Sequence, residues 1–216
     1  CSRLEVEMWQ IPIERGHTAF ENMLQEVFEG TKSGVSEENS QARIRGNLMM
    51  AIANKFGWLI LTTGNKSEMA TGYATLYGDM AGAYAVIKDV PKTLVYELSK
   101  HRNQRGPGSP IPQTIIEKPP SAELRPDQLD RDSLPPYAQL DRIIQMYIEE
   151  RMSTELIVNS ELENPGGGAD AATIKRIIRL VDTNEYKRRQ SPPGPKITGL
   201  AFGKDRRLPI ASRWQK

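Results

Sequence analysis

The stretch Trp58–Asp79, WLILTTGNKSEMATGYATLYGD, decides the fold of this chain. It begins with a short apolar run that is typical of a buried strand, and it breaks at the hydroxyl-rich turn Thr62–Asn65. A predicted helix follows from Lys66 to Ala70, with Glu68 in its first turn. In open α/β sheets, ligands bind where strands end and helix N-termini offer free N–H groups. The stretch therefore predicts a nucleotide site, although an ordinary strand-to-helix loop can have a similar composition.

The flanking sequence predicts an alternation of strands and helices. Apolar spacing indicates strands over 6–13, 58–61 and 84–88, and helices over 17–28, 36–56, 66–70, 91–100, 137–149, 169–181 and 182–189. Segment 103–136 is rich in proline and is expected to be extended. Segment 163–168, with Pro and Gly, is expected to interrupt the regular secondary structure. This order indicates a layered α/β domain. Its strands are too few for a complete sheet, so part of the sheet is expected to lie outside this sequence.

Composition narrows the class of protein. The 216 residues suit one domain, or one domain with an appendage, and 38% of them are hydrophobic. No apolar run approaches 18 residues, so no transmembrane helix and no membrane partner are expected. A single cysteine fits a reducing compartment, and we expect a cytoplasmic protein. One cysteine and two histidines make a structural zinc site unexpected.

The net charge of +2 conceals a basic C-terminal segment. Residues 175–216 carry twelve Lys and Arg against three Asp and Glu. Such a surplus fits a nucleic acid, a polyphosphate ligand or an acidic protein surface. The segment has no stacking aromatics between its basic residues and no known nucleic-acid motif, so we expect no nucleic-acid partner.

The central stretch resembles NAD synthetase, and most closely its glutamine-dependent form. Further similar motifs follow the family's order and extend the resemblance over roughly residues 5–214. These motifs are QARIRGN from Gln41, KDVPKT from Lys88, PPSAELRP from Pro119, DSLPPY from Asp132 and PPGPKIT from Pro192. Ammonia-dependent members often carry a lysine near Leu76 and an acid near Ala83, and this chain has neither. That departure favours the glutamine-dependent branch and leaves the polar contacts there open.

The resemblance implies the Rossmann-like layered α/β fold of the adenine nucleotide alpha-hydrolases, or ATP pyrophosphatases, incomplete at its N-terminal end. It implies an enzyme that uses ATP and Mg²⁺ to adenylate the nicotinate carboxylate of deamido-NAD, after which ammonia displaces AMP and gives NAD. The family's Ser-Gly-Gly-x-Asp-Ser loop, which binds the ATP pyrophosphate, is absent from the sequence. We therefore expect the C-terminal part of a larger homo-oligomeric enzyme, inactive alone, with that loop and a glutaminase domain upstream.

Two regions follow from this interpretation. Residues 1–190 would form the C-terminal part of the synthetase domain, including the extended segment 103–136. Residues 191–216 would form a basic tail that closes over the dinucleotide site.

The matched motifs assign roles to individual residues. Glu68 matches the family carboxylate that binds Mg²⁺ and lies against deamido-NAD, and it is the expected catalytic residue. The expected ATP contacts are Thr63, Lys92 and Ser121, with Lys88 as the competing lysine. The expected deamido-NAD contacts are Asn39, Arg43, Glu68, Tyr73, Thr75, Leu76 and Lys196. Arg45 is expected to point elsewhere, because it lies only two residues from Arg43 on a helix.

Structural interpretations of these residues stay open. Glu68 can complement a helix dipole, Thr63 can be a turn hydroxyl, and Lys92 and Lys196 can be solvated. Arg43 can pair with an acid of the same helix, at Glu37 or Glu38.

Other functions stay open for the whole chain. It can be a nucleotide-binding or regulatory module without catalysis, which the absent loop favours, or a related adenylating ligase. Cys1 can be an amidotransferase nucleophile, although no activating base lies nearby in the sequence. The acids Asp127, Asp130 and Asp132 are expected to be turn and surface residues.

Overall fold

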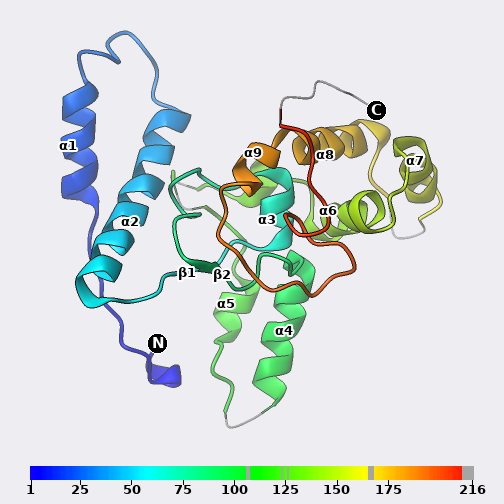
Figure 1. Ribbon diagram of the computed structural model, residues 1–216, viewed down its shortest axis with the longest axis horizontal. Helices are drawn as coiled ribbons and strands as arrows, with labels where there is room; N and C mark the ends of the chain where they lie inside the picture. Colours follow the sequence, from blue (N-terminus) through cyan, green and yellow to red (C-terminus); the bar gives the residue numbers. More distant parts are fainter. Residues whose placement is uncertain (106–107, 123, 126, 165–167, 211–216) are drawn as a thin grey trace.

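The computed structural model describes residues 1–210 except 106–107, 123, 126 and 165–167. Helices surround a small parallel sheet, as Figure 1 shows. The sheet pairs β1 (Leu61–Thr62) with β2 (Tyr84–Ala85), and Leu61 lies opposite Tyr84. Parallel strands need a crossover connection, and α3 (Lys66–Thr71) begins it. The α/β class predicted from the sequence is therefore confirmed.

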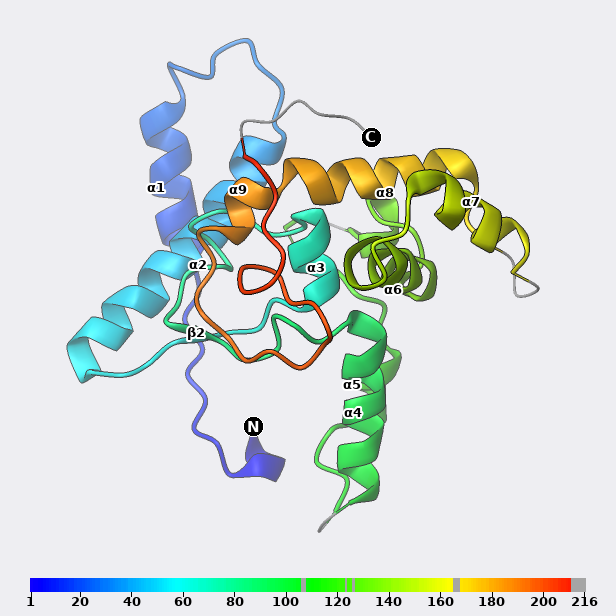
Figure 2. The same cartoon turned by 45° about the vertical axis from the view of Figure 1, so that its right-hand side comes forward.

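The other helices follow the chain in the order α1 (Glu14–Leu24), α2 (Val35–Phe56), α4 (Lys92–Gln104), α5 (Gln113–Glu117), α6 (Tyr137–Ile144), α7 (Thr154–Leu162), α8 (Ala171–Thr183) and α9 (Glu185–Arg188). Short 3₁₀ helices occupy Ser2–Leu4 and Asp130–Asp132. A π-helical turn, Gln145–Glu149, continues α6. The α1–α2 pair stands on one side of the molecule and the α6–α8 group on the other in both Figure 1 and Figure 2.

The strand predictions are partly wrong. Residues 6–13 form no strand. Val6, Met8 and Ile11 are exposed, so the apolar side of this alternating segment is not packed against the rest of the protein. Of the strand predicted at 58–61 only Leu61 lies in β1, and of the strand predicted at 84–88 only Tyr84 and Ala85 lie in β2. The side chains of Leu59 and Leu61 are 66% and 54% exposed, so only one face of this segment has packing partners.

Most predicted helices are present with shifted ends. The helix predicted at 17–28 runs from Glu14 to Leu24, and Asp182 and Thr183 belong to α8 rather than to the last helix. Helix α7 was not anticipated, and the proline-rich segment contains α5 and a 3₁₀ turn. Of the break expected at 163–168, residues 165–167 lie outside the described residues, as do residues 211–216 of the expected tail.

The hydrophobic core lies between α6, the π-helical turn, α7 and α8. Its fully buried side chains are Leu140, Ile143, Ile148, Ile157, Ile174, Ile177 and Val181. Burying one such side chain contributes about 1.5–3 kcal/mol. Helix α3 joins this core through Ala70, so the element that follows the TTGN turn has a rigid support.

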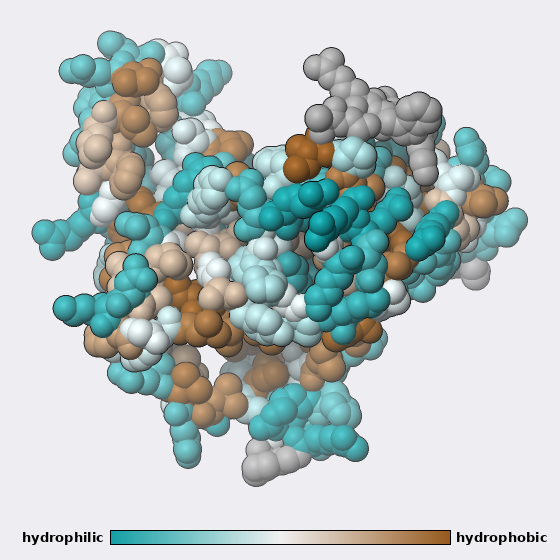
Figure 3. Space-filling view, in the orientation of Figure 1, coloured by the Kyte–Doolittle hydropathy of each residue, from teal (hydrophilic) through white to brown (hydrophobic). Residues whose placement is uncertain are grey.

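Apolar side chains also remain on the surface, as Figure 3 shows over the α1–α2 side of the molecule. Phe20, Met23 and Val27 are exposed there, at or near α1. A second group stacks Phe56 on Trp58, with ring centroids 4.9 Å apart and Trp9 at 5.5 Å from each. No helix in the described part of the chain has the length and apolarity that a membrane span requires.

Candidate functional site

A pocket of about 790 Å³ opens where α2, α3, α4 and segment 72–79 meet. Its volume lies in the range usual for small-ligand sites, about 300–1,000 Å³. The sequence-predicted residues that line it are Asn39, Glu68, Tyr73, Thr75, Lys92 and Ser121. Residues far apart in the sequence are thus collected around one cavity.

The first turn of α3 fixes the position of Glu68 in this pocket. Asn65 is the N-cap, and its side chain accepts a hydrogen bond from the Glu68 N–H at 3.0 Å. The Glu68 carboxylate accepts in return from the Asn65 N–H at 3.1 Å through Oε2. This reciprocal capping box satisfies two N–H groups that a helix start leaves unpaired. Glu68 therefore has a structural role at the start of α3. Its second oxygen, Oε1, is not used in the capping box.

The partner of Oε1 is Lys92, at the start of α4. The Lys92 Nζ lies 3.4 Å from Glu68 Oε1, and both side chains are about one-fifth exposed. The ammonium also lies 5.4 Å from the centre of the Tyr137 ring, within cation–π range. Burial raises the pKa of Glu68, and the Lys92 charge opposes that rise. Lys92 is therefore held in the pocket, against the interpretation as a solvated lysine.

A second set of hydrogen bonds joins the starts of α3 and α4. Ser67, fully buried, donates its hydroxyl to Asp141 of α6 and accepts the Lys92 N–H at 2.8 Å. The other oxygen of Asp141 accepts from both the N–H and the hydroxyl of Thr93, each at 2.8 Å. These bonds satisfy the first N–H groups of α4. They set the distance between the helix ends that carry Glu68 and Lys92.

Helix α2 holds the segment GYATLYGD against the pocket. The Thr75 hydroxyl donates to Asn39 Oδ1 at 2.8 Å, and Arg43 Nε donates to the Leu76 carbonyl at 3.2 Å. Asn39 and Arg43 lie one turn apart, so one face of α2 makes both contacts. Arg43 is thus bonded to this segment and not to the acid of its own helix at Glu37, which accepts from Gly34.

Two glycines permit this contact. A Cβ added to Gly46 of α2 would lie 2.8 Å from the Gly78 carbonyl oxygen, and one added to Gly78 would lie 2.9 Å from the Ala42 Cβ. Neither distance is compatible with a normal side chain. The backbones of α2 and of the 77–78 turn can therefore meet only where both residues lack one.

The acid Asp130 is buried, which corrects the expectation of a surface residue. Only 5% of it is exposed, and its Oδ2 accepts the Tyr137 hydroxyl at 2.6 Å. Its Oδ1 and the Tyr73 hydroxyl are both buried and make no hydrogen bond of good geometry among the described residues. Burial, followed by the charge of Asp130 and its interaction with the hydroxyl, raises the pKa of Tyr73 to about 12. Buried polar groups without partners at a pocket wall are suited to bind a polar ligand.

Two cations of the pocket are not among the predicted site residues. Arg45 lines this pocket, whereas Arg43 lines a different cavity, so the two side chains point in different directions as their spacing predicts. Lys187 of α9 lines the same pocket as Arg45 and donates to the carbonyls of Gly72 and Ala74 at 2.7 and 2.8 Å. Burial lowers the pKa of Lys187. In the sequence Lys187 is one of many basic residues near the C-terminus, so nothing distinguishes it there.

The remaining candidates lie outside this pocket. Thr63 is exposed directly after β1, and Leu76 meets Arg43 through its backbone. Lys196 pairs with Asp205 at 2.8 Å. The competing lysine, Lys88, donates to Ser191 Oγ and the Pro192 carbonyl at 2.7 and 2.5 Å, so it holds the C-terminal segment.

A larger cavity, of about 920 Å³, lies between α1 and α2 and is lined by Arg43. It contains neither Glu68 nor Lys92 among its lining residues. We assign the candidate site to the smaller pocket, because it combines the carboxylate and lysine pair with buried, unpartnered polar atoms.

The carboxylates do not form a complete metal cage. No group of three or more His, Cys, Asp or Glu residues that could hold a metal ion occurs in the described ranges. Mg²⁺ in nucleotide enzymes usually takes one or two protein carboxylates together with substrate phosphates and water. Glu68 lines the pocket and is a carboxylate of the kind such a shared site uses, with Lys92 next to its Oε1.

The sequence also matches known proteins. A family model described as NAD synthase matches residues 1–191. A glutamine-dependent NAD(+) synthetase of Thermotoga maritima is 50% identical over 216 residues, which cover 100% of this chain and 36% of that protein. One from Acinetobacter baylyi is 51% identical over 197 residues, 91% of this chain and 35% of that protein. The chain thus spans about a third of the length of these relatives.

Solved structures show the same fold. A glutamine-dependent NAD(+) synthetase from Cytophaga hutchinsonii superposes with a TM-score of 0.76 at 23% identity, covering 95% of this chain and 34% of that one. The NMN synthetase of Francisella tularensis gives 0.67 at 25% identity, covering 87% and 66%.

The fold is a layered α/β fold of the adenine nucleotide alpha-hydrolase type. The carboxylate and lysine of the site meet at two helix N-termini, after a parallel strand. The chain belongs to the NAD synthase family, and the resemblance seen in the sequence is confirmed.

Proposed function

We propose that this chain is the C-terminal part of the synthetase domain of a glutamine-dependent NAD synthetase. The intact enzyme would use ATP to adenylate the nicotinate carboxylate of deamido-NAD, and ammonia would then displace AMP. A glutaminase domain outside this chain would supply the ammonia, in line with the names of the relatives. The observation that carries the proposal is the Glu68–Lys92 pair, which faces a pocket wide enough for a nucleotide.

Reaction between a carboxylate and ATP brings two anions together, so the site must neutralise their charge. Lys92 would bind ATP phosphates, and Thr63 and Ser121 would add hydroxyl contacts. Glu68 would hold Mg²⁺ together with those phosphates, and the metal would supply further neutralisation of charge. The pyrophosphate loop would come from upstream sequence, so the 216-residue chain alone would be inactive.

Deamido-NAD would lie against α2 and the GYATLYGD segment. The proposed contacts are Asn39, Arg43, Tyr73, Thr75 and Leu76, with Lys196 reaching the ligand from the tail. The unpartnered Tyr73 hydroxyl and Asp130 Oδ1 support a polar ligand at this wall. Lys187 and Arg45 add positive charge, which suits a dinucleotide with a pyrophosphate.

We also propose a homo-oligomer in the cytoplasm. The exposed apolar residues of the α1–α2 pair, Phe20 and Met23 among them, support a subunit contact there. The single cysteine is compatible with a reducing compartment.

The test uses the full-length protein that contains this chain. NAD formation from deamido-NAD, ATP, Mg²⁺ and glutamine should be measured for the wild type and for Glu68→Ala. The variant should lose at least about 100-fold in kcat/KM, the usual size for removing a charged group that acts in the transition state, and Glu26→Ala, at an exposed turn, should change little. Nucleotide binding by the wild type without any NAD formation would instead support a binding module.

A further inference from the structure

Lys66 is a buried cation at an unfavourable place. It is the first residue of α3, and only 1% of it is exposed. The positive end of the helix dipole lies at a helix N-terminus, so a cation there is disfavoured. Burial of a charge adds a further cost unless the charge is paired and hydrogen-bonded. Such a residue needs strong partners, and it serves no role in the function proposed above.

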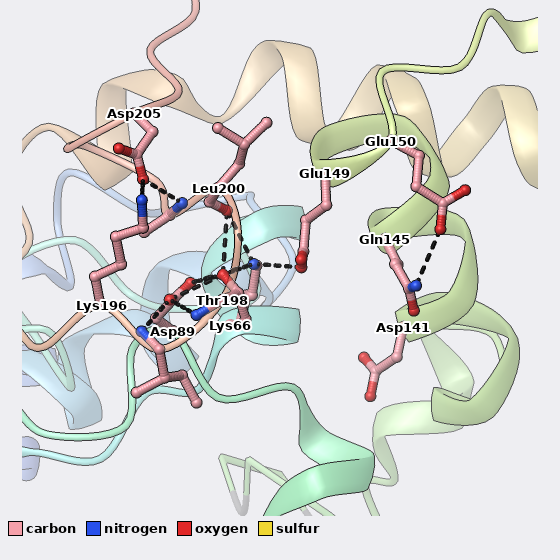
Figure 4. Close-up of polar contacts among 12 residues, drawn as sticks. Lys66, Asp89, Asp141, Gln145, Glu149, Glu150, Lys196, Thr198, Leu200 and Asp205 are labelled. Carbon is pink, nitrogen blue, oxygen red and sulfur yellow. Dashed lines mark hydrogen bonds and ion pairs between the residues drawn. The ribbon is translucent and has the colours of Figure 1, made fainter.

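Its partners come from three other segments, as Figure 4 shows. The Lys66 Nζ lies 2.7 Å from Glu149 Oε1 and 3.2 Å from Asp89 Oδ1. It also donates to the Thr198 hydroxyl at 2.6 Å and to the Leu200 carbonyl at 3.1 Å. One ammonium thus joins α3 to the loop before α4, to the end of the π-helical turn and to the C-terminal segment.

Two of these segments, the loop before α4 and the C-terminal segment, are also bonded to each other. Asp89, 3% exposed, accepts from the N–H groups of Ile197 and Thr198, both at 2.8 Å. Glu149 is the last residue of the π-helical turn, a local geometry that is often found at functional sites.

The loop before α4 is the segment that matters for the pocket. Lys66 holds it twice, through Nζ to Asp89 and through its N–H to the Val90 carbonyl at 2.9 Å. Two residues further along the chain, the Lys92 N–H donates a hydrogen bond to Ser67 Oγ. Lys66 and Ser67 therefore bind the chain on both sides of Pro91, where α4 begins with Lys92. Consecutive residues of one helical turn thus hold Lys92 in place and present Glu68 to it.

We propose that Lys66 is a positioning residue, which sets the distance and orientation between Glu68 and Lys92 and ties them to the C-terminal segment. The inference rests on the proposed function of that pair. Lys66 itself is absent from the residues that line the pocket. Its effect would pass through the Asp89–Lys92 loop.

The test compares two lysines that hold the same C-terminal segment. Lys66→Met removes the junction, whereas the control Lys88→Met removes only the bonds to Ser191 and Pro192. In the full-length enzyme, Lys66→Met should lower kcat or raise the Mg²⁺ concentration for half-maximal rate by about 10-fold or more, the size usual for loss of an outer-shell support. Lys88→Met should stay within about 2-fold, and Lys66→Arg should recover part of the loss.

A second readout does not depend on turnover. Hydrogen exchange of the amides of residues 92–95, measured without substrates, should be faster in Lys66→Met than in wild type and unchanged in Lys88→Met. If Lys66→Met fails to fold, Lys66→Met/Asp89→Asn takes its place, because the unpaired buried carboxylate is then removed as well.

The outcomes separate the two proposals. Equal effects of Lys66→Met and Lys88→Met, or a loss of stability with unchanged Mg²⁺ dependence and exchange, would overturn the positioning role. Full turnover in Glu68→Gln would instead overturn the function assigned to the pocket. An inactive Glu68→Gln beside a normal Lys66→Met would remove only the present inference.

Discussion

Glu68 has two partners that constrain the two oxygens of its carboxylate. One oxygen closes the capping box of α3, and the other meets Lys92. Burial outweighs these partners and raises the pKa of Glu68. A residue that costs stability in its charged form and faces a pocket is typical of a functional site.

This pKa shift predicts a dependence of stability on pH. A raised carboxyl pKa means that the folded chain binds the proton more tightly than the unfolded chain. The stabilising contribution is therefore complete below the ordinary value of 4.5 and is lost as the pH rises through the folded pKa. Glu68→Gln keeps a capping-box side chain but cannot ionise. We expect it to unfold at a higher urea concentration than wild type at pH 7, with the difference shrinking toward pH 4.5.

Urea unfolding at both pH values measures this effect, with Glu26→Gln, at an exposed position, as the matched control. A lower midpoint for Glu68→Gln at pH 7 would mean that the Lys92 pair stabilises the charged form more than burial destabilises it.

At the scale of elements, the contact between α2 and the 77–78 turn gives the pocket one of its walls. Asn39 and Arg43 can reach Thr75 and Leu76 only because the two backbones approach closely at Gly46. At Gly46, helix propensity therefore disfavours glycine, whereas the close packing requires it. Glycine costs a helix roughly 0.5–1 kcal/mol relative to alanine, and the close contact offsets that cost.

Two helical glycines should consequently respond to alanine with opposite signs. Gly46→Ala places a Cβ 2.8 Å from the Gly78 oxygen and should lower the unfolding free energy by about 1–3 kcal/mol. Gly16→Ala, in α1, meets only the Ile44 side chain at 3.4 Å and should be neutral or stabilising by up to about 1 kcal/mol. Chemical denaturation of both variants checks this, and a neutral Gly46→Ala would show that α2 can move away from the turn.

At the scale of the whole molecule, the sheet is covered on one side more than on the other. Ile60 and Thr62 are 9% and 6% exposed, whereas Leu59 and Leu61 between and beside them are more than half exposed. Alternate residues of a strand face opposite sides, so among the described residues one side of the β1 segment has no covering layer. This pattern fits the expectation that part of the layered domain lies outside this sequence.

A pair of substitutions on neighbouring residues tests that expectation. In the 216-residue chain, Leu61→Thr should change the unfolding free energy by about 0.5 kcal/mol or less, as at an exposed position. In the full-length protein it should cost about 1–3 kcal/mol, because the side chain would then be buried. Ile60→Thr should destabilise both forms. The same small effect of Leu61→Thr in both would indicate that this face stays open.

The sequence by itself determined the start of α3 and the family. The TTGN turn with Asn65 before Lys66 specifies a helix start, because an asparagine N-cap and a glutamate three residues later can pair only in that geometry. The motifs around Glu68 and Lys92 were enough to predict both as site residues, and the structure places them 3.4 Å apart. The roles of all the predicted site residues, Glu68 and Lys92 included, stay predictions.

Only the tertiary structure decided which alternating stretches became strands and which charged residues faced inward. Residues 6–13 have the pattern of a strand, but a strand forms only where a neighbouring chain accepts its hydrogen bonds. Lys66, Asp130 and Lys187 look like surface charges in the sequence, since burial depends on distant partners such as Asp89, Tyr137 and the Gly72 carbonyl. The spacing of apolar residues in the sequence indicates local geometry only. The partner of a buried charge depends on which distant segments the tertiary fold brings next to it.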